Sequence, residues 1–258
     1  MIFGWLRRRR RRRLLAKPFP AEWLPYLDGL PFYGTLARDE QERVREIVRV
    51  LQSEKNWEGC GGLVLTDEIC VVISAQAALL VLGFEHDYYP RVRSILVYPS
   101  TFVVQGRDTG SKGDIRSERQ ATLGEAWSRG PVVLAWDASR LGGANAEDGR
   151  NVVLHEFAHK LDFRDDVVDG TPILREGEQY EAWHRIMTVE YESLVAKAES
   201  GRPALLDKYG ATEPAEFFAV ATECFFEKSR QVRKKHAELY ELLRTYYGQD
   251  PAERYGSS

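Results

Sequence analysis

The sequence predicts one domain of the α+β class, with a small mixed or antiparallel sheet and several long helices. Short apolar runs typical of strands fall at residues 93–99, 101–105 and 131–136. Apolar residues at helical spacing dominate the chain after residue 150. The chain has 258 residues, which is long enough for one full-sized core.

Amphipathic spacing predicts the first long helix over residues 39–54, where the apolar positions 44, 47, 48 and 51 share one face. Thr66 is a suitable N-cap for a second helix that runs to residue 83. Its apolar stretch, residues 71–84, is shorter than the roughly 20 residues needed to cross a bilayer, so we expect a buried helix. The same spacing predicts helices over residues 151–163, 178–199, 214–226 and 237–247.

Charge divides the chain into a basic arm and an acidic body. Residues 1–17 hold Arg7 to Arg13 and Lys17 and no acidic residue, whereas the remainder holds 28 basic and 39 acidic residues, a net charge of -11. An acidic body argues against a nucleic-acid-binding protein. We expect the arm to be a disordered, solvated tail, with an anionic membrane surface or an acidic partner as alternatives. Residues 18–250 are assigned to the single domain, and residues 251–258 to a C-terminal tail.

The cysteines and the N-terminus indicate a cytoplasmic protein. Cys60, Cys70 and Cys224 form neither a CxxC pair nor the even set of a disulfide framework, which favours a reducing compartment. The order of basic and apolar residues at the start is the reverse of a secretory signal. We expect no transmembrane segment.

The motif His155-Glu156-Phe157-Ala158-His159 is HExxH. On a helix, residues i and i+4 lie on one face, so His155 and His159 can hold one metal ion from the same side. Glu156 lies beside them and can reach a water at the metal, as the general base of a metallopeptidase does. The apolar residues around the motif predict that its helix is largely buried.

A third ligand is expected, because catalytic zinc usually takes three protein ligands. The extended HExxHxxGxxH form is excluded, since Asp162 and Asp165 stand at its last two positions. The histidines at positions 86, 184 and 236 lie in a predicted loop or on charged helices and are expected at the surface.

Glu216 is the better candidate for the third ligand. Glu216 and Glu223 lie seven residues apart on one face of the predicted helix 214–226, among apolar side chains. A carboxylate in such surroundings is costly unless it meets a cation. A zinc ion or a salt bridge would each meet that need, and the pattern alone leaves both open.

Several linked motifs resemble the MtfA family (Mlc titration factor A), the glucose-regulated metallopeptidases. The likeness spans nearly the whole chain, and it rests on an arginine-rich start, on Cys60-Gly61-Gly62-Leu63, and on residues 75–80, 131–137, 151–162 and 209–226. The resemblance implies a zincin-like domain with one Zn²⁺ per chain and a site similar to that of anthrax lethal factor. It assigns the third ligand to Glu216 and a hydrogen bond to the reacting oxyanion to Tyr209.

The resemblance further implies a cytoplasmic aminopeptidase acting on a peptide substrate, and the transcriptional repressor Mlc as a partner. The strand at residues 131–136 is a candidate edge on which an extended peptide pairs. Asp162 and Glu223 are candidates for accepting hydrogen bonds from the imidazoles that hold the metal.

Two alternatives remain at this stage. Glu58-Gly59-Cys60 is similar to the EGC motif of peptide deformylases, but Cys60 precedes His155 by 95 residues, far more than in that family. The second alternative is a non-catalytic protein that binds a regulator and keeps a vestigial metal site.

Overall fold

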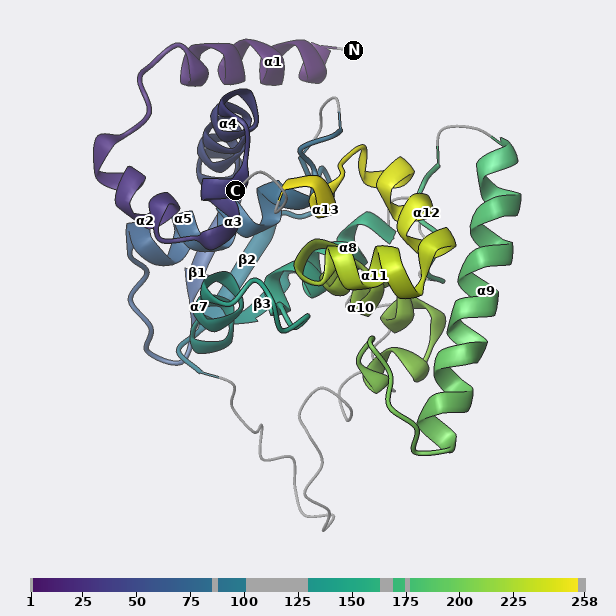
Figure 1. The fold of residues 1–258 in the computed structure, drawn as a ribbon. Coiled ribbons are helices and arrows are strands. Elements are labelled where there is room, and N and C mark those ends of the chain that lie inside the picture. The colour runs from purple at the N-terminus through teal and green to yellow at the C-terminus, as the bar shows by residue number, and fades with distance from the viewer. Residues whose placement is uncertain (1, 85–87, 101–129, 163–168, 175–176, 255–258) are drawn as a thin grey trace.

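The computed structural model describes residues 2–84, 88–100, 130–162, 169–174 and 177–254. A small sheet lies beside a larger assembly of helices (Figure 1). The N-terminal helices lie on one side of the sheet, and the helices of the second half of the chain gather on the other side of the molecule. Helices in the middle of the chain connect the two parts.

The sheet contains β1 (Asn56–Gly59), β2 (Ser94–Tyr98) and β3 (Val132–Ala135) in the order β1-β2-β3. Trp57 pairs with Ile95, and Ile95 pairs with Val132. All three strands are parallel, so the predicted mixed or antiparallel sheet is wrong. Parallel neighbours need a crossover, and helix α5 provides one between β1 and β2. The strand predicted at residues 101–105 lies outside the described residues.

Each predicted helix forms within a few residues of its expected bounds. Thr66 caps α5 by accepting a hydrogen bond from Ile69 N at 3.3 Å. Short helices that carry too few residues for a clear period were not predicted. The helices are α1 (Ile2–Leu15), η1 (Ala21–Trp23), α2 (Leu24–Asp28), α3 (Pro31–Thr35), α4 (Arg38–Glu54), α5 (Asp67–Leu80), α7 (Trp136–Ala144), α8 (Val152–Asp162), α9 (Gly177–Glu199), η3 (Lys208–Ala211), α10 (Pro214–Glu227), α11 (Ser229–Lys235), α12 (Ala237–Tyr247) and α13 (Pro251–Arg254).

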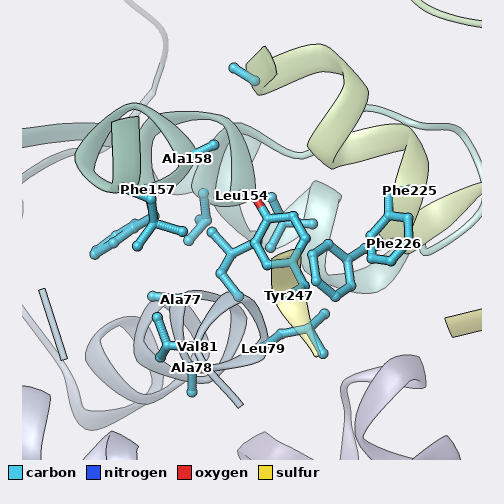
Figure 2. Packing of buried hydrophobic residues seen from close by; sticks show 14 of the residues in the cluster. Ala77, Ala78, Leu79, Val81, Leu154, Phe157, Ala158, Phe225, Phe226 and Tyr247 are labelled. Atoms are coloured by element: carbon cyan, nitrogen blue, oxygen red, sulfur yellow. The ribbon is translucent and has the colours of Figure 1, made fainter. Parts of the chain in front are cut away.

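Helix α5 is the centre of the core, with every residue from Ile69 to Leu80 buried, as its apolar stretch predicts. It packs on α4, α7 and α8. Figure 2 shows the apolar face of α8 above α5, with rings from α10 and α12 beside it. Among the described residues, no helix has the length and apolar character needed to span a bilayer. The core therefore fixes α8 on one face and leaves its other face for chemistry.

The basic arm is a helix rather than the expected disordered tail. Helix α1 packs across α4 (Figure 1), and the guanidinium of Arg11 pairs with Glu54 at 2.6 Å. The side chain of Arg49 donates hydrogen bonds to the carbonyls of Leu14 and Lys17. These contacts come from residues more than 30 positions away, so local sequence gave no sign of them.

The C-terminal segment also packs on the domain. Within the region predicted to be a tail, Pro251–Arg254 form α13, and Ala252 is buried. Arg254 donates hydrogen bonds to Glu40 at 2.5 Å and to Gln249 at 2.9 Å. Residues 255–258 lie outside the described residues.

The turn after α5 makes a close backbone contact with the end of α12. A Cβ at Gly83 would lie 2.1 Å from the carbonyl oxygen of Tyr247 and 3.0 Å from that of Gly248. Gly248 itself adopts the left-handed conformation that ends α12, with φ 62°. Two glycines therefore allow the C-terminal helix to approach the central one.

We expect Gly83→Ala to lower the free energy of unfolding by roughly 2 kcal/mol or more, because the new methyl group meets backbone atoms that cannot move independently. Gly34→Ala on α3 is the matched control, since a Cβ there meets nothing within 4 Å. It should be neutral or stabilise by up to about 1 kcal/mol. Urea unfolding monitored by circular dichroism measures both, and equal effects would contradict the close contact.

Candidate metal centre

Helix α8 begins at a well-capped N-terminus. The Asn151 side chain accepts hydrogen bonds from Val153 N and Leu154 N, each at 3.1 Å. Val153, Leu154 and Phe157 are buried in the core. The helical period then turns His155 and His159 toward α10, which packs on α8.

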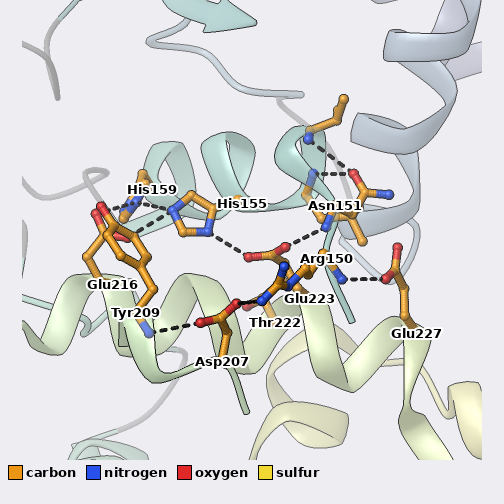
Figure 3. A network of polar contacts seen from close by, with 12 residues as sticks. Arg150, Asn151, His155, His159, Asp207, Tyr209, Glu216, Thr222, Glu223 and Glu227 are labelled. Atoms are coloured by element: carbon orange, nitrogen blue, oxygen red, sulfur yellow. Dashed lines mark hydrogen bonds and ion pairs between the residues drawn. The ribbon is translucent and has the colours of Figure 1, made fainter. Parts of the chain in front are cut away.

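Helix α10 supplies carboxylates to this interface. Pro214 occupies its first turn, and every residue from Ala215 to Glu227 is buried. Glu216, Glu223 and Glu227 lie at successive levels of the helix and face α8 (Figure 3). A helix so completely buried carries charged side chains only where they meet partners.

Glu216 meets both histidines of α8. One carboxylate oxygen lies 2.9 Å from His155 Nε2, and the other lies 3.3 Å from His159 Nε2. The two Nε2 atoms are 3.2 Å apart. His155 and Glu216 are each 1% exposed, which excludes water from most of this cluster. Of the described residues, these three form the one group of His, Cys, Asp and Glu side chains with the spacing of a metal site.

Glu223 holds His155 from the opposite side of the ring. Its Oε1 lies 2.7 Å from His155 Nδ1, and its Oε2 accepts a hydrogen bond from Asn151 N. When Nδ1 donates its proton to Glu223, the lone pair of Nε2 faces the Glu216 carboxylate. The arrangement is that of a carboxylate orienting a metal-binding imidazole.

The electrostatics of the cluster require a positive charge at its centre. Burial alone would lower the pKa of His155, but its hydrogen bonds with Glu216 and Glu223 raise it to about 10. Burial would raise the pKa of Glu216, but its contacts with His155 and His159 hold it well below its usual range. A proton or a metal cation can supply this charge.

The donor set fits zinc. Two imidazoles and one carboxylate are a common set for catalytic zinc. Ligand bonds of about 2.0–2.2 Å place tetrahedral ligand atoms roughly 3.4 Å apart, close to the separations of 2.9, 3.2 and 3.3 Å observed here.

The two predicted catalytic side chains flank this cluster. Glu156 is half-buried on α8, and its charge raises the pKa of Lys160 one turn away, although burial lowers that pKa more strongly. Tyr209 is half-buried in η3, and its ring centroid lies 6.1 Å from that of His155. Figure 3 shows the Tyr209 ring beside Glu216, turned toward the histidines.

Other predicted site residues lie apart from the cluster or make different contacts. Asp162 is fully buried and accepts a hydrogen bond from Gly170 N at 3.0 Å, so it holds the chain that returns after α8. Its role toward an imidazole stays a prediction.

Cys60 follows β1 and is not part of the metal group, which gives the deformylase alternative no support. His184 is exposed, and His236 pairs with Glu190 at 2.7 Å.

A chain of polar contacts that the sequence did not reveal ties η3 to α8. Arg150 pairs with Asp207 at 2.7 Å, and Asp207 accepts a hydrogen bond from Tyr209 N at 3.0 Å. Glu227 accepts a hydrogen bond from Arg150 N at 2.9 Å. Asp207 at the N-cap of η3 was the only local sign of this chain.

Comparison with known proteins gives matches along most of the chain. A family model described as glucose-regulated metallo-peptidase M90 matches residues 5–248. An uncharacterised protein of Synechocystis sp. is 38% identical over 244 residues, which cover 94% of this chain and 89% of the relative. Mlc titration factor A of Serratia proteamaculans is 31% identical over 242 residues, with 91% and 89% coverage. The protein of that name from Klebsiella pneumoniae (strain 342) is 31% identical over 237 residues, with 88% and 85% coverage.

We expect Glu216→Gln to weaken zinc binding by about 100-fold or more, since loss of an outer hydrogen-bond partner alone typically costs roughly 10–100-fold. Glu213→Gln is the matched control, because it makes the same charge change at an exposed position three residues earlier. Zinc content after dialysis and competition with a chelator measure both variants. Equal zinc affinity in the two variants would exclude Glu216 as a ligand.

Glu227 makes stability depend on pH. Burial raises the pKa of this carboxyl to about 8, against hydrogen bonds that lower it. In the unfolded chain the Glu227 carboxyl loses its proton near pH 4.5, whereas in the folded protein it keeps the proton up to about pH 8. The free energy of unfolding therefore falls as the pH rises between these two values. Glu227→Gln should therefore gain about 1–3 kcal/mol relative to wild type between pH 5 and pH 8. Urea unfolding in chelator tests this, with Glu181→Gln on the exposed face of α9 as the unaffected control.

Proposed function

Because the chain belongs to the glucose-regulated metallo-peptidase M90 family, we propose that it is a zinc-dependent aminopeptidase with His155, His159 and Glu216 as metal ligands. The observation that carries the assignment is the convergence of these three side chains, two of them buried and His159 half-buried, whose ligand atoms lie within 4.8 Å of one another. A carboxylate and two imidazoles this close need a cation between them.

Each residue around the cluster has one task in the proposed reaction. When bound, zinc supplies a Lewis acid that polarises the scissile carbonyl and activates a water molecule. Glu156 accepts the proton of that water and later delivers it to the leaving amine. Tyr209 donates a hydrogen bond to the oxyanion that forms on the carbonyl. Glu223 keeps the His155 ring in the tautomer and orientation that bind the metal.

The peptide substrate is proposed to bind along β3. Within the described part of the sheet, β3 pairs only with β2, and α8 packs against β3. Lys160, next to His159, donates a hydrogen bond to the carbonyl of Gly130 at 3.2 Å and so fixes the start of β3 relative to α8. An extended peptide on this edge would hydrogen-bond through its main chain while its scissile bond faces the cluster.

The aminopeptidase assignment is supported by the resemblance to MtfA-type peptidases. It is tested by hydrolysis of alanyl and other aminoacyl chromogenic substrates and of their N-acetylated counterparts. Free-amine substrates should be cleaved and the acetylated ones should not. Efficient cleavage inside an acetylated peptide would instead make the enzyme an endopeptidase.

We expect Glu156→Gln to retain about one zinc per chain and to lower kcat by roughly 10²–10⁴-fold, because it removes the proton acceptor and keeps the shape of the side chain.

Tyr209→Phe should lower kcat with little change in KM, since the tyrosine hydroxyl acts only in the transition state. Glu213→Gln serves as the exposed control. A Glu156→Gln protein with near-normal turnover would remove Glu156 from the mechanism.

A second proposed function is binding of a transcriptional repressor of the Mlc type. Its support is that relatives called Mlc titration factor A share about 30% of their residues with this chain over some 90% of its length. A cytoplasmic location is proposed with both functions, and it is supported by the three free cysteines, since free thiols persist in a reducing compartment.

Titration of purified Mlc with wild-type and Glu156→Gln protein separates the two functions. Equal affinity of the two proteins would make repressor binding stoichiometric and independent of hydrolysis. Turnover without any repressor binding would restrict the proposal to the peptidase. Repressor binding by a protein that holds no zinc would favour the vestigial-site alternative.

A further inference from the structure

The arginines of α1 have no role in the metal centre. Helix α1 lies on the outside of the molecule across α4, and the candidate metal centre lies between α8 and α10 (Figures 1 and 3). Its seven consecutive arginines divide into two sets by exposure. Arg7 and Arg11 are half-buried, whereas Arg8, Arg9, Arg10, Arg12 and Arg13 are exposed.

The inward set anchors the helix. Arg11 forms a bidentate pair with Glu54, and both side chains are only about 15% exposed (15% and 14%). The Arg11 guanidinium also lies over the ring of Tyr88, 5.3 Å from its centroid. Arg10, although exposed, adds a hydrogen bond to the carbonyl of Ser53 at 3.3 Å. These contacts fix the rotation of α1 about its axis and so decide which arginines face outward.

A basic cleft of about 430 Å³ lies between α1 and the domain. Its charged lining comprises Glu54 and five basic residues, Arg7, Arg10, Arg11, Lys55 and Arg93. Five cations around one carboxylate leave a strong excess of positive charge in a concave surface, which concentrates anions. Guanidinium groups bind phosphate oxygens in bidentate geometry, so a phosphate group is the anion that suits this cleft.

The exposed surface of α1, from its outward face to the edge of the cleft, combines cations with apolar side chains. Trp5 is 57% exposed and Leu6 is 48% exposed, and Leu6 also lines the cleft. The guanidinium of Arg9 lies over the Trp5 ring at 5.4 Å. Among the described residues, no acidic side chain pairs with Arg8, Arg12 or Arg13.

We propose that α1 and the cleft beneath it dock the protein on an anionic phospholipid surface, with the arginines on headgroup phosphates and Trp5 and Leu6 in the interface. Tryptophan favours the headgroup region of bilayers, and clusters of Lys and Arg bind the anionic headgroups beside it. The body outside residues 1–17 carries 39 acidic against 28 basic residues, so an anionic bilayer repels it and confines contact to this face.

A lipid surface fits these residues better than nucleic acid does. A nucleic acid would use the arginines but would leave Leu6 exposed, and the acidic body would oppose the approach of a long polyanion. Trp5 and Leu6, near the start of the helix, gain a more favourable environment in a bilayer interface than in water or on a nucleic acid. Because this face is separate from α8 and α10, the inference does not rest on the peptidase assignment.

Vesicle sedimentation tests the proposal. The full chain should bind vesicles that contain phosphatidylglycerol, should not bind pure phosphatidylcholine, and should lose binding as salt rises. The double variant Arg8→Glu/Arg12→Glu should lower the partition coefficient by about thirtyfold or more. The matched control Lys234→Glu/Lys235→Glu makes the same charge change at exposed positions of α11 and should bind nearly as the wild type does.

Three results would overturn the proposal: equal losses in the two double variants, equal binding to neutral vesicles, or tighter binding to duplex DNA than to anionic vesicles at the same salt. Binding of inorganic phosphate without vesicle binding would also overturn it and assign the cleft to a soluble phosphate. Circular dichroism and aminoacyl hydrolysis, expected to be unchanged, show that the variants fold. Arg8→Gln/Arg12→Gln, expected to show a smaller loss, replaces the first variant if that one does not fold.

Discussion

The candidate metal centre depends on the two hydrogen bonds of one buried carboxylate. Glu223 accepts from His155 Nδ1 through one oxygen and from Asn151 N through the other. The first contact sets the tautomer of a candidate ligand, and the second joins α10 to the start of α8. Because both contacts use the same rigid group, the position of the His155 ring and the packing of the two helices are set together. Glu216 lies two turns earlier on α10, so the same packing of the two helices also directs its carboxylate toward the histidines.

The core explains how the α8–α10 interface stays fixed. Helix α8 contacts α5 through its apolar face and α10 through its histidine face. Phe225 of α10 and Tyr247 of α12 are both fully buried, and their rings stack with centroids 5.7 Å apart. This contact packs α12 against α10. Buried polar groups on such a frame keep good hydrogen-bond geometry, because rearranging them would displace several close-packed helices.

Local sequence predicted the features that depend on local periodicity. The i, i+4 spacing placed His155 and His159 on one helix face, and the apolar neighbours of Glu216 pointed to a buried carboxylate needing a cation. The role of Tyr209 came only through the resemblance, since a tyrosine in a loop has no pattern of its own. The resemblance to the MtfA family is confirmed by the family match and by the relatives.

Features that depend on distant residues were not predictable. Strand direction follows from crossover connections, and β1, four residues long, gave no strand signal that would have revealed the crossover through α5. A run of seven arginines predicts disorder because like charges one turn apart repel. Helix α1 forms on the domain because Arg11 pairs with Glu54, 43 residues away, and because Arg49 donates hydrogen bonds to the carbonyls of Leu14 in its last turn and of Lys17 just beyond it. Neither partner can be recognised from the run itself.

The cluster of His155, His159 and Glu216 joins two helices whose contributing residues are about 60 positions apart in the chain. A metal held there acts as a crosslink, and its binding free energy adds to the free energy of folding. Metal supply would then affect more than chemistry: a chain made when the metal is scarce would open more often at this interface and be exposed to proteolysis for longer. The amount of protein in the cell would rise and fall with the metal even at constant synthesis, so the site would set the lifetime of the protein as well as its chemistry.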